Sequence, residues 1–156
     1  MWNPYTQNKR KIILAKSQWL LSCSLSPAGT RAAAGGLSNT VAVYNIPQDG
    51  PTIVDSRQGQ AETSLHGHDG AVLHCRFAPN GADGDTLLTS SGDHTLKLWD
   101  INSKAVSADL VGHTGDVSCF EFTDVSTVVS VSTDASWKAW YAPCGPAQGS
   151  VCRAPL

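Results

Sequence analysis

Two stretches of sequence decide the fold, because both occur twice. LHGHDGAV at residues 65–72 returns as LVGHTGDV at residues 110–117, so that the two Gly-His pairs are 45 residues apart. SGDHTLKLWD at residues 91–100 returns as STDASWKAWY at residues 132–141, with the tryptophans 41 residues apart. In each copy of the second stretch an aspartate precedes the tryptophan by six residues. The chain therefore contains an internal repeat of 40 to 45 residues, which points to a repeat architecture.

The segments between these marks alternate polar and apolar residues over short runs and are separated by turn compositions such as Pro79-Asn80-Gly81. A period of this length with Gly-His and Trp-Asp marks is typical of WD repeats, in which each repeat supplies four strands. A weaker third copy runs through residues 19–45, where Ser38 replaces the aspartate and Tyr44 the tryptophan. We therefore predict an all-β chain, a partial WD40 β-propeller of about three four-stranded antiparallel blades.

The repeats divide the chain into a propeller segment at residues 1–141 and an irregular Pro/Gly-rich tail at residues 142–156. The predicted blades lie roughly at 13–46, 65–101 and 110–141, and residues 1–3 read as the end of a preceding blade. A closed propeller has about four to eight blades. Three repeats indicate either a fragment or a chain that must assemble with other blades.

Composition narrows the possible partners. The formal net charge is −2 and charged residues make up 15% of the chain, so no basic face for nucleic acid is expected. The apolar runs are too short to insert into a membrane. The five cysteines lack the spacing of a metal site, and we expect no metal and no cofactor. The expected location is cytoplasmic, with any attachment to the inner face of the plasma membrane made through partners.

The histidine, serine and aspartate of each repeat resemble a catalytic set, but a structural interpretation is stronger. In a WD blade these residues and the tryptophan form a buried hydrogen-bond network, in which the histidine meets the serine and the serine meets the indole N–H. A buried polar group without a partner costs about 1–3 kcal/mol, so such a set is retained as a unit. A catalytic set has no reason to occur twice, and we predict no enzyme. The predicted networks are His68, Ser91, Asp93 and Trp99, and His113, Ser132, Asp134 and Trp140.

Residues outside the repeat marks resemble one family, the β subunits of heterotrimeric G proteins. The resembling runs include residues 17–23, 27–29, 35–39, 44–45 and 112–117. The run Gly35-Gly36-Leu37-Ser38-Asn39 is the most specific, because it matches without carrying a WD mark. The resemblance implies a scaffold that binds a GDP-loaded α subunit, a γ subunit and effectors in signalling from transmembrane receptors. Trp137 stands where this family usually has a small residue.

The resemblance also implies which residues contact the α subunit. Trp19 matches the central tryptophan of that surface, Leu37 and Asn39 match neighbouring positions, Asp116 matches an acidic contact, and Lys9 matches a lysine facing the α subunit's N-terminal helix. An aromatic anchor within a polar rim is a common hot-spot pattern. Without the resemblance, Trp19 would read as core and Lys9 as a solvated loop residue. Two alternatives to this function stay open: a generic WD-repeat adaptor for protein–protein interaction, and a truncated copy without function.

Overall fold

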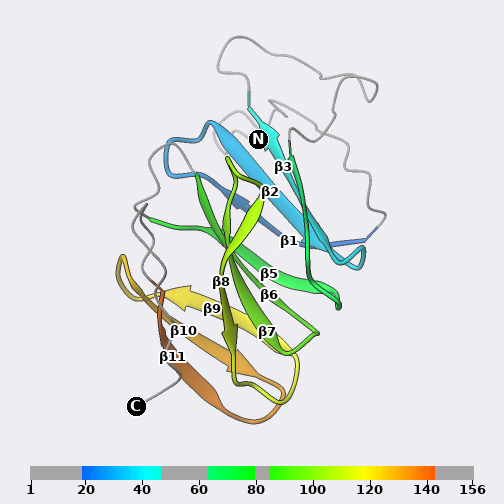
Figure 1. The fold of residues 1–156 in the computed structure, drawn as a ribbon, viewed down its shortest axis with the longest axis vertical. Helices are drawn as coiled ribbons and strands as arrows, with labels where there is room; N and C mark the ends of the chain where they lie inside the picture. The colour runs from blue at the N-terminus through cyan, green and yellow to red at the C-terminus, as the bar shows by residue number, and fades with distance from the viewer. Residues whose placement is uncertain (1–18, 47–62, 80–84, 143–156) are drawn as a thin grey trace, which may run out of the picture.

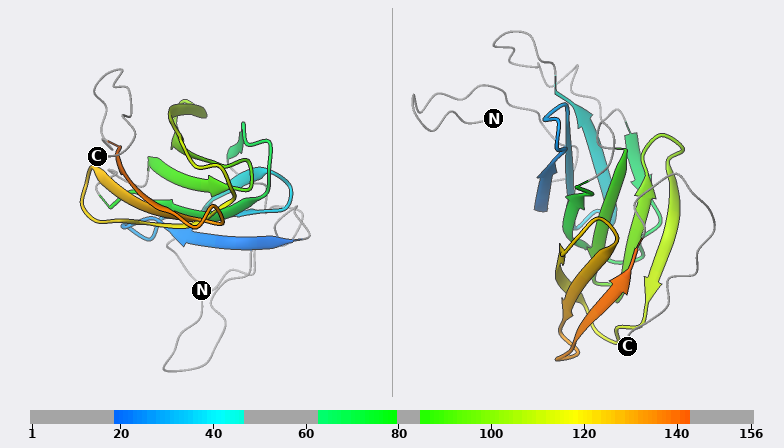
Figure 2. Two further views of the ribbon diagram at one scale, coloured as in Figure 1. Left: turned by 90° about the horizontal axis from the view of Figure 1, so that it is seen from below. Right: turned by 90° about the vertical axis from the view of Figure 1, so that its left-hand side faces the viewer.

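The computed structural model describes residues 19–46, 63–79 and 85–142. The described residues form eleven β-strands and no helix, which confirms the all-β prediction. Each strand belongs to one of three antiparallel sheets, which follow one another along the long axis of the molecule (Figures 1 and 2). No described segment forms a helix with the length and apolar character needed to cross a membrane.

The three sheets share one plan. The first contains β1 (Leu20–Leu25), β2 (Arg31–Gly36), β3 (Thr40–Asn45) and β4 (Thr63–His66) in that order. The second contains β5 (Val72–Phe77), β6 (Thr86–Ser91), β7 (Thr95–Asp100) and β8 (Ala105–Val111). The third contains β9 (Val117–Phe122), β10 (Thr127–Ser132) and β11 (Trp137–Tyr141). The first strands β1, β5 and β9 lie next to one another where the sheets meet. We call them the inner strands.

The outer strands correct the predicted blade boundaries. Residues 65 and 66 were expected to begin the second blade, but they belong to β4, which pairs with β3 and completes the first sheet. Likewise Leu110 and Val111 end β8 in the second sheet. The Gly-His mark therefore follows the last strand of one sheet and precedes the first strand of the next. Among the described residues the third sheet has three strands, because no later strand pairs with β11.

Two apolar clusters fill the spaces between the sheets. One joins the first and second sheets and includes Val41, Val43, Val72, Leu87 and Trp99. The other joins the second and third sheets and includes Leu88, Leu96, Val117, Phe120 and Trp140. Strand alternation produces this arrangement, since successive side chains of a strand point to opposite faces of the sheet. The sheets thus pack face to face, as successive blades of a propeller do.

Candidate functional site

The buried polar network of the second sheet is present, but its central hydroxyl belongs to a residue other than the predicted serine. The His68 imidazole lies 2.7 Å from Asp93 Oδ2 through Nδ1 and 2.7 Å from Thr89 Oγ1 through Nε2. The Trp99 indole N–H donates to the same Thr89 hydroxyl at 2.8 Å. Ser91 instead accepts the Asp93 amide at 3.1 Å. The prediction that Ser91 links histidine to tryptophan is therefore wrong, and Thr89 makes that link.

The third sheet repeats this geometry. His113 lies 2.8 Å from both Asp134 Oδ2 and Ser130 Oγ, and the Trp140 indole N–H donates to Ser130 at 2.8 Å. Ser132, predicted to make the link, accepts the Asp134 amide at 3.2 Å. The physical reason is the same in both sheets. Ser91 and Ser132 end their strands at the hairpin, so their hydroxyls meet turn amides, whereas the linking hydroxyl lies two residues earlier on the same face.

Each aspartate of the two networks accepts hydrogen bonds that stabilise the hairpin turn in which it lies. Asp93 accepts from the Thr95 amide and hydroxyl at 3.0 and 2.7 Å, and from the Asp69 amide at 3.1 Å. Burial alone would raise the pKa of Asp93, but hydrogen bonds from Thr95 and His68 outweigh it and lower that pKa below its ordinary value. Hydrogen bonds from Ser136 and the Thr114 amide lower the pKa of Asp134. Both carboxylates are therefore charged at neutral pH.

Burial limits what these networks can do chemically. Thr89 and Ser130 are fully buried, and both histidines are only 6% exposed. Burial lowers the pKa of His68, which is accordingly neutral near pH 7. The hydroxyl next to each imidazole already accepts an indole N–H, so it is not presented to a substrate. Within the described ranges no group of three or more His, Cys, Asp or Glu side chains is placed to hold a metal ion.

Among the described residues the first sheet has no histidine network, and small side chains occupy the positions of the linking hydroxyl and the turn aspartate. Ala34 occupies the position of Thr89, and the Ser38 hydroxyl lies 3.1 Å from Thr40 Oγ1 where Asp93 binds Thr95. Gly36 ends β2, and a Cβ there would lie 1.9 Å from the carbonyl oxygen of Trp19. This close approach lets the Leu37 amide donate to that carbonyl at 3.1 Å. Trp19 and Leu37 are consequently neighbours.

Four of the five predicted partner-contact residues lie along one edge of the molecule. Trp19 and Leu37 are exposed, at 66% and 53% of their surface. The Asn39 side chain donates to the Asp69 carbonyl at 3.2 Å, which joins the first sheet to the loop before β5. Asp116, in the loop before β9, lies 3.5 Å from His94 Nε2. Lys9, like residues 1–3 and the tail at 143–156, lies outside the described residues.

We call this edge the entry rim: Trp19, Leu37, Asn39, Asp69, His94 and Asp116, all in turns or just before an inner strand. Sequence reasoning did not find Asp69 and His94. His94 occupies the same hairpin position as Asn39, and both adopt the left-handed conformation, with φ of 70° and 58°. Asn adopts the left-handed conformation more readily than most residues, so the conformation of the turn by itself favours an asparagine at position 39. Its side-chain bond to the Asp69 carbonyl nevertheless ties two sheets together.

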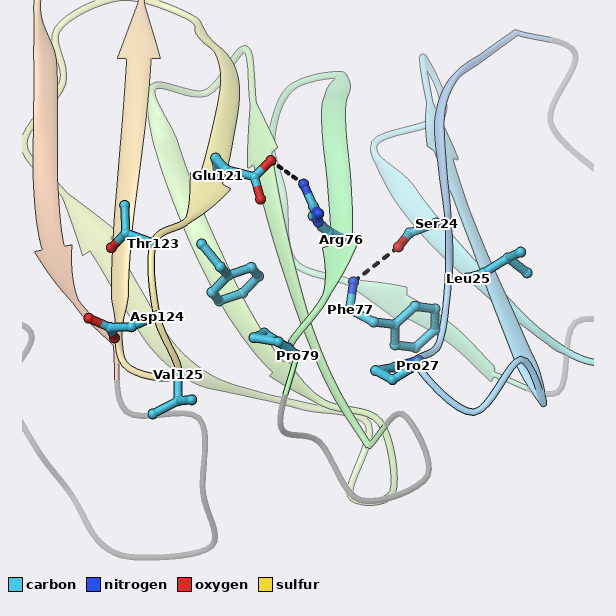
Figure 3. Close-up of a pocket in the computed structure, with 11 residues that line it drawn as sticks. Ser24, Leu25, Pro27, Arg76, Phe77, Pro79, Glu121, Thr123, Asp124 and Val125 are labelled. Carbon is cyan, nitrogen blue, oxygen red and sulfur yellow. Dashed lines mark hydrogen bonds and ion pairs between the residues drawn. The ribbon is translucent and has the colours of Figure 1, made fainter.

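A hollow of about 480 Å³ lies at the opposite ends of the inner strands (Figure 3). The ion pair between Arg76 and Glu121 crosses it, and Pro27 and Pro79 form part of its wall. Phe77 donates its amide to Ser24 Oγ at 3.1 Å beneath that pair. These two contacts link the three inner strands, β5 to β9 through the ion pair and β5 to β1 through the hydrogen bond. The exposed apolar residues predicted to bind a partner are at the other edge.

Comparison with known proteins agrees with these observations. The family model described as "WD domain, G-beta repeat" matches residues 59–100, which include β4 of the first sheet and β5, β6 and β7 of the second. The "Guanine nucleotide-binding protein G(I)/G(S)/G(T) subunit beta-1" of Homarus americanus is 36% identical over 139 residues, or 87% of this chain. The chain spans 37% of that relative's length. The networks, the three sheets and these matches together indicate the fold of a partial WD40 β-propeller, and the chain is similar, over most of its own length, to a G-protein β subunit.

Proposed function

We propose that this chain is a G-protein β-like signalling scaffold that binds a GDP-loaded G-protein α subunit through the entry rim. The observation that carries the proposal is the exposed pair Trp19 and Leu37, joined through the backbone and followed along the rim by polar groups. Large apolar side chains at the centre of a polar surface are the usual anchors of protein–protein interfaces. The matching relative is itself named as a subunit of a guanine nucleotide-binding protein.

Electrostatics assigns different roles to the two parts of the rim. Asp69 and Asp116 add two exposed aspartates to the rim, and the Asp116 side chain is about half exposed. Such charges suit a basic segment of a partner and affect the rate of association more than the final affinity. Trp19 and Leu37 would supply most of the binding free energy. In this proposal a γ subunit and effectors are further partners, and the chain itself performs no catalysis.

The test is a pull-down of purified α subunit, loaded either with GDP or with a non-hydrolysable GTP analogue, by the immobilised chain. The proposal expects retention of the GDP form and release of the activated form. Trp19→Ala should weaken binding of the GDP form by more than about 2 kcal/mol, roughly thirtyfold in Kd. Tyr141→Ala is the matched control, because Tyr141 is an exposed aromatic residue, at 58%, in the third sheet and away from the rim.

The outcomes separate the alternatives. Capture that ignores the bound nucleotide would favour a generic WD-repeat adaptor. No capture by a chain whose circular dichroism shows folded β-sheet would reject the proposal. Equal loss of binding in Trp19→Ala and Tyr141→Ala would show that the entry rim is not the contact surface. Asp116→Asn should slow association and leave dissociation almost unchanged, which surface plasmon resonance can measure.

A further inference from the structure

The inner strands of the second and third sheets meet along a seam of paired side chains. β5 and β9 lie in contact, and their side chains pair at two steps, Arg76 with Glu121 and His74 with Cys119. The first of these is the ion pair that crosses the hollow. In the second, the Cys119 Sγ lies 3.7 Å from His74 Nδ1. A thiol beside an imidazole provides the nucleophile and the base that a reactive cysteine requires.

The Cys119 thiol is free and exposed, so a small molecule can reach it. Its accessibility does not depend on the third sheet being the last one described. The register of the sheets gives Ser22, His74 and Cys119 the same position in the three inner strands. Ser22 contacts the second sheet and His74 contacts the third, yet both side chains are still partly exposed. This position therefore stays accessible when another sheet follows.

The His74 imidazole is placed to take the proton of the thiol. Its ring packs edge-on against the Phe120 ring, with the centroids 4.8 Å apart, which fixes the imidazole beside the thiol. Burial and the neighbouring Arg76 charge lower the pKa of His74, and Glu121 acts in the opposite direction. The imidazole is therefore neutral at pH 7 and can accept a proton. The Cys119 sulfur also lies 3.8 Å from the Phe120 carbonyl oxygen, but a carbonyl does not act as a base.

A buried hydroxyl on the neighbouring strand adds to this cluster. Ser90 is fully buried, and its Oγ is the one buried side-chain oxygen or nitrogen among the described residues that has no hydrogen-bond partner. Ser90 lies opposite His74 in the pairing of β5 with β6, so the two side chains are on the same face of the second sheet. A hydroxyl can accept a hydrogen bond from the N–H of an imidazolium. Ser90 is thus placed beside the ring that would gain a proton.

We propose that Cys119 is a site of covalent modification by small disulfides of the glutathione class, with His74 as the base that takes the thiol proton. The Cys119 sulfur attacks one sulfur of the disulfide, so that a new S–S bond forms as the old one breaks. His74 returns the proton to the leaving thiolate, which gives one mixed disulfide and one free thiol. A disulfide suits this pair because it is itself the oxidant and its leaving group accepts the proton. No residue of the entry rim takes part, so the inference does not rest on α-subunit binding.

The experiment measures the rate of mixed-disulfide formation in the full chain with Cys144 and Cys152 replaced by serine. Glutathione disulfide is the probe, and mass spectrometry of peptides digested without reductant reports Cys119 and Cys23 separately in one sample. Cys23 is the internal control, because it is exposed but has no hydrogen bond to a histidine within the described part of the chain. At pH 7 Cys119 should react at least about tenfold faster than Cys23. His74→Gln, which keeps a polar side chain without a base, should remove that difference.

The pH profile separates base catalysis from simple accessibility. The ratio of the Cys119 rate to the Cys23 rate should be largest between about pH 7 and 8. It should fall towards one below about pH 5, where His74 is protonated, and above about pH 10, where hydroxide removes thiol protons without help. A ratio near one at pH 7, or a ratio independent of pH, would overturn the proposal, and this comparison needs no variant that could fail to fold.

Two variants complete the test, with circular dichroism to confirm that each is folded. A Cys119 that stays fast in folded His74→Gln would overturn the proposal, because accessibility alone would then set the rate. Ser90→Ala should lower the ratio at pH 7, since the imidazolium loses the hydroxyl beside it. An unchanged ratio in Ser90→Ala would contradict that role of the hydroxyl.

Discussion

Thr89→Val removes the hydroxyl that links the network of the second sheet while keeping the shape of the side chain. The Trp99 indole N–H and His68 Nε2 then lose their partner in a fully buried site. Each buried group left without a hydrogen bond costs about 1–3 kcal/mol. We therefore expect the free energy of unfolding to fall by about 3 kcal/mol, and by no less than about 2.

Ser91→Ala provides the comparison, because Ser91 accepts a single turn amide, that of Asp93, at 3.1 Å. Asp93 is only partly buried, so water can replace that bond, and the expected loss is about 0.5–1.5 kcal/mol. Urea unfolding at pH 7, followed by circular dichroism, measures both changes through the midpoint at constant slope. A loss for Ser91→Ala equal to or larger than that for Thr89→Val would refute the assignment of Thr89 as the link.

The third sheet offers an independent repeat of this experiment. Ser130→Ala removes the partner of His113 and Trp140, whereas Ser132→Ala removes only the acceptor of the Asp134 amide. The first change should again cost more than the second, by about 1–2 kcal/mol. Agreement between the two sheets would show that the order of the losses follows from the geometry of the repeat. A reversed order in the third sheet would mean that burial at one site, and not the network, sets the loss.

Three further predictions follow from the described geometry. Gly36→Ala should destabilise the first sheet by more than about 2 kcal/mol, since the new Cβ collides with the Trp19 carbonyl; unchanged urea unfolding would contradict this. Stability should fall as the pH drops below about 6.5, where the unfolded chain protonates His68 but the folded one keeps it neutral. Stability should fall again below pH 4. The pKa of Asp93 is lower in the folded chain than in the unfolded chain, so its carboxylate takes up a proton first in the unfolded chain. A melting temperature independent of pH between 7 and 3 would refute both pH predictions. Burial raises the pKa of the Cys75 thiol to about 11, so iodoacetamide at pH 8 should alkylate it much more slowly than the exposed cysteines, and mass spectrometry of digested peptides should find it last.

The repeat marks predicted the fold well because they are local. The turn aspartates Asp93 and Asp134 and the tryptophans Trp99 and Trp140 each lie on one hairpin, where a spacing of six residues fixes their relation. The linking hydroxyl was harder to assign, because both Thr89 and Ser91 lie on the same face of β6. Only the position of His68, which lies in a loop far away in the sequence, shows that Thr89 and not Ser91 makes the link. A contact between distant segments is set by sheet packing, which a single sequence does not contain.

The entry rim was predicted in part for the same reason. Trp19, Leu37, Asn39 and Asp116 were predicted as partner contacts through resemblance to a family, and each lies in a turn or just before an inner strand. Asp69 and His94 were not predicted, because each joins the rim through a contact with a residue of another repeat. The end residues of the outer strands were assigned to the wrong blade. β3 and β4 are far apart in the sequence, and nothing in the residues between them indicates that the two strands pair.

Each sequence repeat begins in the last strand of one sheet and continues in the next sheet. This arrangement has a mechanical consequence. The outer strand of the second sheet runs from Ala105 to Val111 and continues directly into Gly112-His113, whose imidazole is anchored in the third sheet. Peeling β8 away would therefore pull on the network of its neighbour, and loss of that network would release the end of β8. Thermal unfolding of the second and third sheets should for this reason occur as a single cooperative transition, and force applied along the chain should rupture both together.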